Sequence, residues 1–161
     1  MVNDRSSDPQ RGPEQAPVGE YSCWMPRHRK SVPIARRLLR DFLTGLNARE
    51  HYGDSAELVL GELLTNAVLH ARTPRERQLF VRFGLTASRL LVEVHDAGRG
   101  LPLPRPAGVD SECGRGLLLV ARLAVDWGWR AREGGIGKTV WALLAPETGQ
   151  GGPVPAPGAQ A

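Results

Sequence analysis

Residues 61–71, GELLTNAVLHA, combine an apolar run with three polar side chains of different chemistry. Glu62, Asn66 and His70 follow one another at intervals of four, so on a helix they lie along one face. A carboxylate can take a proton from an attacking hydroxyl or orient a water, and an amide oxygen can hold a hydrated Mg²⁺ ion. We assign no chemistry to His70, for which we expect a packing or capping role.

Two glycine-containing segments further along the chain could complete a site with this stripe. Asp96 ends a predicted strand and is followed by Gly98 and Gly100, in the sequence DAGRG. Gly114 and Gly116, in the sequence GRG, stand where a later helix is expected to begin. Glycines there allow close backbone approach, and a helix N-terminus offers unpaired N–H groups with a partial positive charge, which suits a phosphate. Together these residues describe a nucleotide cradle.

Each of these features also has an ordinary structural interpretation. A polar stripe is most often a solvent-facing helix side, DAGRG alone is most often a turn, and GRG can be only the start of a helix. The order and spacing of the three features favour the site. A P-loop within GGIGKT at 134–139 is rejected, because the VWALLA that follows before Pro146 is too short for the helix that a P-loop must open.

Two helices are predicted in the first half of the chain. Apolar residues at helical spacing indicate an amphipathic helix with Ser31 as its N-cap and an end near Gly45–Asn47. A second helix is expected to open at Asp54, where Glu57 completes a capping pair, and to run to about Ala71. The polar stripe lies in the second half of that helix.

Strands and one further helix are predicted around these two. A short strand at 21–26 comes first, and alternating apolar residues later predict a β-hairpin whose second strand ends at His95–Asp96. A Gly/Pro-rich loop at 97–115 leads to a third helix, and two strands follow it. The order β-α-α-β-β-α-β-β predicts an α/β (α+β) two-layer sandwich, with helices on one face of a mixed, mostly antiparallel sheet.

Composition limits the domain organisation and the partners. The chain has 161 residues and is 41% hydrophobic, which is enough for one core. Residues 1–20 and 147–161 lack apolar periodicity, so we expect two disordered tails around one domain at 21–146. The formal charge of +4 is spread along the chain. The basic run RHRK at 27–30 could belong to a solvent-exposed helix face or could bind a partner. Cys23 and Cys113 have no metal-ligand or redox spacing, and no signal peptide or membrane span is recognised, so we expect a cytoplasmic protein.

The segments ELLTNAVLHA, DAGRG, GRGLLLV and GKTVWALL occur in an order that resembles the successive nucleotide-binding boxes of the GHKL ATPase superfamily. That group includes histidine-kinase catalytic domains and gyrase. The resemblance covers about residues 20–146 and is closest to small stand-alone bacterial members, the anti-sigma factors that are also serine protein kinases, and their actinobacterial relatives. It implies the Bergerat (GHKL) ATP-binding fold, with ATP and Mg²⁺ as ligands.

The resemblance also implies roles by position. Glu62 would be the general base, Asn66 the Mg²⁺ ligand, and Asp96 the acceptor of the adenine amino group. A lid formed by residues 101–113 would cover the phosphates. The other positions implied to contact ATP lie on the adenine floor, at the phosphates and in the last box: Gly98, Gly100, Gly114, Arg115, Gly116, Leu117 and Thr139.

Three functional hypotheses follow. The resemblance implies an ATP-binding regulator that transfers the γ-phosphate to a serine of a STAS-type anti-anti-sigma partner and so controls transcription. The alternative is a non-catalytic, nucleotide-dependent binding module that sequesters a sigma factor or another partner, which would need the same pocket. A DNA-binding protein would rest on the basic charge alone, so we expect no direct nucleic-acid partner, and no membrane partner. Since relatives often dimerise, a homodimer is one expected assembly.

Overall fold

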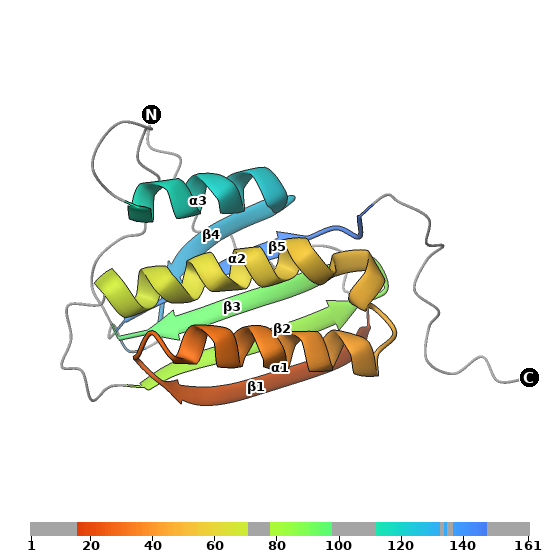
Figure 1. The fold of residues 1–161 in the computed structure, drawn as a ribbon, viewed down its shortest axis with the longest axis horizontal. Helices are drawn as coiled ribbons and strands as arrows, with labels where there is room; N and C mark the ends of the chain where they lie inside the picture. Colours follow the sequence, from red (N-terminus) through yellow and green to blue (C-terminus); the bar gives the residue numbers. More distant parts are fainter. Residues whose placement is uncertain (1–15, 71–77, 98–111, 133, 135–136, 148–161) are drawn as a thin grey trace, which may run out of the picture.

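The computed structural model describes residues 16–70, 78–97, 112–132, 134 and 137–147 (Figure 1). Within these residues the chain forms three helices: α1 (Ser31–Gly45), α2 (Arg49–His70) and α3 (Glu112–Leu123). It forms five strands: β1 (Pro17–Pro26), β2 (Gln78–Thr86), β3 (Leu90–Asp96), β4 (Asp126–Ala131) and β5 (Lys138–Leu144). Their order along the chain is the one predicted from the sequence.

The strands form one sheet in the order β1-β2-β3-β5-β4, and each neighbouring pair is antiparallel. The helices cover one face of this sheet (Figure 1). On β2, for example, Leu79, Val81 and Phe83 are buried while the residues between them are at least partly exposed, as strand alternation requires. The predicted two-layer sandwich is therefore confirmed, with a fully antiparallel sheet in the described part of the chain.

The central helix α2 lies between α1 and α3 and packs on the sheet (Figure 1). Leu60, Leu63 and Leu64 of α2 are at most 1% exposed, as are Leu39 and Leu43 of α1. Burying a leucine side chain stabilises a fold by about 1.5–3 kcal/mol relative to leaving it in water. This packing fixes α2 over the sheet and so determines which way its polar stripe points.

Two arginines of α1 join that helix to α2. The Arg40 guanidinium donates two hydrogen bonds to the Glu57 carboxylate, at 2.9 and 2.8 Å. The Arg36 guanidinium lies on Gly61 of α2, where an added Cβ would fall 2.7 Å from the Arg36 Nε atom. Helix packing therefore accounts for these two basic residues.

The starts of the helices differ from those predicted. Lys30 is the N-cap of α1, and the Ser31 hydroxyl donates instead to the Pro26 carbonyl at 2.6 Å. α2 begins at Arg49 and not at Asp54, because Asn47, with φ of 54°, ends the preceding turn and Tyr52 is already fully buried in the core. The Gly/Pro-rich loop predicted to reach residue 115 ends sooner, since α3 begins at Glu112.

The predicted domain limits at 21 and 146 are slightly too narrow. β1 begins at Pro17, which pairs with Thr86 of β2. At the other end the Glu147 amide donates to the His51 carbonyl at 2.7 Å, and its carboxylate accepts a hydrogen bond from Ser55 at 2.6 Å. The remainder of both predicted tails lies outside the described residues. Of the helices that are described, none has the length and apolarity needed to cross a membrane.

Candidate functional site

Three elements that carry predicted site residues meet at one end of the molecule. The second half of α2 runs above β3 toward the end of that strand, and α3 starts at the same end (Figure 1). α2 packs against both α3 and β3. Residues that are far apart in the sequence are thus brought to a common region.

The Glu62 carboxylate points toward α3. A Cβ built on Gly116 would collide with Glu62 Oε2 and would lie 3.2 Å from Glu62 Cδ, so the half-buried carboxylate lies directly on the Gly116 backbone. Gly116 belongs to the N-terminal part of α3, where the helix dipole is positive and the first four N–H groups have no partner within the helix. Glu62 of the polar stripe therefore faces the N-terminal part of α3, and the absence of a side chain at Gly116 leaves room for its carboxylate.

Asn66 lies one helical turn beyond Glu62 on the same side of α2 and is half-buried. Gly114 lies in the first turn of α3. Arg115 is exposed to solvent, whereas Leu117 is 2% exposed and packs into the core. The remaining predicted features lie outside the described residues: Gly98, Gly100, residues 101–111 of the lid and the side chain of His70.

Asp96 lies opposite Lys138 in the β3–β5 register. Both residues point to the helix-covered face, because Val94 and Val140, two positions along each strand, are buried in the core. Asp96 is 1% exposed and Lys138 is 8% exposed. The Lys138 Nζ atom lies 3.7 Å from Asp96 Oδ2. The structure thus adds to the site a buried cation that the sequence reasoning did not assign.

Gly137 lets β5 approach the end of β3 closely. Its φ is +91°, a conformation that favours glycine, and an added Cβ would collide with the Asp96 carbonyl oxygen and lie 2.8 Å from the Ala97 Cα atom. Gly137 was not singled out from the sequence either. A signal for both residues was present in GKT, because a lysine next to glycine at the start of a core strand is unusual.

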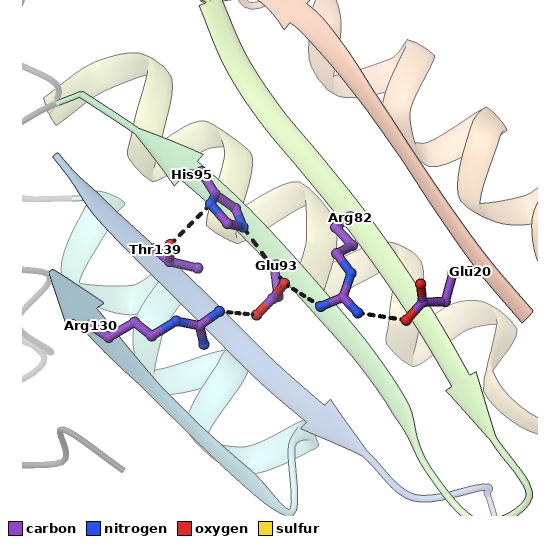
Figure 2. Close-up of polar contacts among 6 residues, drawn as sticks. All are labelled: Glu20, Arg82, Glu93, His95, Arg130 and Thr139. Carbon is purple, nitrogen blue, oxygen red and sulfur yellow. Dashed lines mark hydrogen bonds and ion pairs between the residues drawn. The ribbon is translucent and has the colours of Figure 1, made fainter. Parts of the chain in front are cut away.

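Thr139 lies on the other face of the sheet, away from the helices. Strand alternation turns it opposite to Lys138, and its hydroxyl lies 3.1 Å from His95 Nδ1 (Figure 2). The structure therefore does not bring the Thr139 side chain together with that of Asp96. The polar side chain of the last box that shares the face of Asp96 is that of Lys138.

A network of charged side chains occupies this other face; we call Glu20, Arg82, Glu93, His95 and Arg130 the open-face network (Figure 2). Glu93 is 1% exposed and accepts hydrogen bonds from Arg82 at 3.0 Å and Arg130 at 2.6 Å, and Arg82 also bonds Glu20 at 2.6 Å. Burial alone would raise the pKa of Glu93, but its contacts with His95, Arg130 and Arg82 outweigh this and lower the pKa to about 2. Glu93 is therefore ionised and held by its neighbours at neutral pH.

A family model described as a histidine kinase-like ATPase domain matches residues 25–143. The match extends from the end of β1 into β5 and includes every residue that the sequence analysis assigned to the site. No curated protein gives a significant match to the chain.

Proposed function

This chain belongs to the histidine kinase-like ATPase domain family, and we propose that it is a serine protein kinase that uses ATP bound where α2, α3, β3 and β5 meet. The partner would be a STAS-type anti-anti-sigma protein, and the reaction would control a sigma factor and hence transcription. The family implies ATP binding; the kinase activity and the partner rest on the resemblance of the sequence boxes to the anti-sigma serine kinases.

The observation that carries the proposal is the contact of the Glu62 carboxylate with Gly116 at the start of α3. A helix N-terminus favours phosphate oxygens, because its free N–H groups and its dipole both attract negative charge. A carboxylate and a bound phosphate at the same site would repel each other. A carboxylate in this position is therefore expected to have a chemical role, such as accepting a proton. Its position therefore supports a role as the base that receives the proton of an attacking hydroxyl.

The residues present fit Mg·ATP. The start of α3, with Gly114 and Gly116, would hold the phosphates, and the Asp96 carboxylate would accept a hydrogen bond from the adenine amino group. The Asn66 amide oxygen is a suitable ligand for Mg²⁺, which prefers oxygen and keeps several waters. When bound, Mg²⁺ would neutralise charge on the phosphate oxygens.

In the proposed reaction the serine hydroxyl oxygen attacks the γ-phosphorus as its proton passes to Glu62. The bond between the γ-phosphorus and the bridging oxygen breaks, ADP leaves with that electron pair, and Glu62 later returns its proton to water. The protein contributes mainly by positioning the two reactants and by stabilising charge, as in other phosphoryl transfers.

The test is transfer of labelled γ-phosphate to candidate partners by wild type and by Glu62→Gln. We expect the variant to bind ATP within about threefold of wild type and to transfer phosphate about 10²–10⁴-fold more slowly, the usual contribution of a general base. Glu57→Gln is the matched control, because Glu57 lies on the same helix but is bonded to Arg40. Transfer at the wild-type rate in Glu62→Gln would remove the base assignment.

The non-catalytic alternative is supported by the exposed side of α1. Ile34 is 55% exposed, and Arg37 beside it is exposed and makes none of the helix contacts described for Arg36 and Arg40. In this alternative, Ile34 and Arg37 would form part of the surface that binds a sigma factor. A stable complex formed by wild type in the presence of ATP, with no label transferred to any partner, would favour this function over the kinase.

A further inference from the structure

We infer that Lys138 is a base-recognition residue that, together with Asp96, binds the Watson–Crick edge of adenine. Asp96 would accept a hydrogen bond from the 6-amino group, and Lys138 would donate one to N1. The inference rests on the proposed ATP site and names a residue that determines its specificity.

The strand register places the two side chains together. Asp96 and Lys138 are directly opposite in the β3–β5 pair, both on the helix-covered face, with their charged atoms 3.7 Å apart. Gly137 brings the start of β5 against the Asp96 carbonyl and so fixes where the Lys138 stem leaves the backbone. The result is an acceptor and a donor side by side at the end of the sheet.

An ammonium and a carboxylate can each bond several partners at once. An ammonium carries three donors, and a carboxylate carries about four lone-pair sites. Adenine presents a donor, the 6-amino group, next to an acceptor, N1. A 6-oxo purine presents the opposite order, with an oxygen in place of the amino group and N1–H in place of the acceptor. In the same orientation such a base would place its oxygen against the Asp96 carboxylate, which is unfavourable.

A purely structural role for the pair is less well supported. Lys138 begins a strand whose other helix-facing residues, Val140, Ala142 and Leu144, are apolar and buried. Desolvating a lysine and an aspartate costs free energy that their mutual attraction barely offsets, so an apolar pair of similar size would serve the fold equally well. A buried acceptor–donor pair at the end of the predicted site is therefore better explained by recognition of a polar ligand.

The experiment compares binding of ATP and 1-deaza-ATP by calorimetry. The analogue keeps the 6-amino group and lacks only the N1 acceptor. We expect wild type to bind the analogue about tenfold more weakly, the usual effect of a lost hydrogen bond to a charged donor. Lys138→Met should bind the two nucleotides equally, because its side chain has a similar length and no donor. Lys138→Arg should retain discrimination.

The matched control is Lys30→Met, the same substitution at an exposed lysine that caps the start of α1. It should keep the tenfold ratio of wild type. A tenfold ratio that persists in Lys138→Met would overturn the inference, and so would a wild type that binds both nucleotides equally while ATP binding itself stands. If Lys138→Met does not fold, the inference is tested by the ratio of the affinities for ATP and 1-deaza-ATP in wild type and in Lys138→Arg. Equal binding of the two nucleotides by both proteins would overturn it. Absence of any ATP binding by folded wild type would instead refute the proposed function, and this inference with it.

Discussion

Strand β3 carries two acidic side chains that are equally buried, on opposite faces of the sheet. Glu93 and Asp96 are each 1% exposed. Glu93 is held by two guanidinium groups at 3.0 and 2.6 Å, whereas Asp96 faces an ammonium at 3.7 Å and a close turn at Gly137. Burial alone therefore does not distinguish an acid that supports the fold from one that we propose to contact a ligand.

The surroundings of the two carboxylates do distinguish them. The open-face network spans four strands and ties β1, β2, β3 and β4 together through hydrogen bonds to charged groups (Figure 2). Asp96 is the last residue of β3, a strand that ends at the same end of the molecule as the second half of α2 and the beginning of α3 (Figure 1). We therefore expect changes at Glu93 to alter mainly stability and changes at Asp96 to alter mainly nucleotide affinity.

The largest expected effect is that of Glu93→Gln. Removing one charge from a buried network leaves its partners uncompensated, so the free energy of unfolding should fall by about 4 kcal/mol. Affinity for ATP should stay within about twofold of wild type under conditions where both are folded. Urea unfolding and calorimetry measure the two quantities.

Glu20→Gln is the control for that change, because Glu20 also bonds Arg82 but its side chain is 54% exposed. It should cost less than about 1 kcal/mol. A similar loss of stability in both variants would contradict the central place of Glu93 in the network.

Gly137→Ala should lower stability by about 3 kcal/mol and also weaken ATP binding. The added methyl group would require a left-handed backbone at φ of +91° and would press on the Asp96 carbonyl, two unfavourable effects of about 1–3 kcal/mol each. Gly134, at φ of +88° and with no atom of the described residues within 4 Å of its added Cβ, is the matched control. Gly134→Ala should show the backbone effect alone, with unchanged ATP affinity; equal behaviour of the two variants would argue against a contact between Gly137 and the site.

The low pKa of Glu93 predicts a component of acid sensitivity. Its pKa is about 2 in the folded protein and 4.5 in its unperturbed state, so the unfolded chain binds more protons between these values. The stabilisation is therefore complete above pH 4.5 and is lost as the pH falls toward 2, with about 2 kcal/mol lost between pH 6 and pH 3. Urea unfolding of wild type, measured between pH 6 and pH 3, should show this loss in the free energy of unfolding. Parallel pH profiles for wild type and Glu93→Gln would disprove it.

Gly116→Ala should have the smallest effect on stability among these variants. The free energy of unfolding should change by less than about 1 kcal/mol. The new methyl group meets only the end of a flexible side chain, so Glu62 can turn away without moving the backbone. Phosphate transfer should nevertheless fall nearly as far as in Glu62→Gln. A normal transfer rate in a folded Gly116→Ala protein would show that the position of Glu62 at α3 is not required.

Local patterns predicted much of this fold, including the elements that carry the candidate residues Glu62 and Asp96. The alternation through Leu90, Val92 and Val94 correctly ended β3 at Asp96, and spacing by four correctly turned Glu62 away from open solvent. The start of α2 was missed because the capping residues at Asp54 looked like a helix start, while the burial of Tyr52 is a tertiary effect.

Two further features were missed because they depend on register between distant strands. The role of Thr139 was assigned by its place in a motif, and only the pairing of β3 with β5 turns that residue to the other face and Lys138 toward Asp96. The open-face network joins residues as far apart as Glu20, Glu93 and Arg130. Contacts across so much sequence leave no periodic signal in any one segment.

The most direct test of the account is calorimetric titration of wild type, Asp96→Asn and Glu93→Gln with Mg·ATP. We expect Asp96→Asn to bind about tenfold more weakly, because a neutral amide oxygen is a weaker acceptor than a carboxylate and no longer forms an ion pair with Lys138, while Glu93→Gln should bind as wild type does. Wild-type affinity in Asp96→Asn, or an equal loss in Glu93→Gln, would contradict the claim that the nucleotide binds at the helix-covered end of β3.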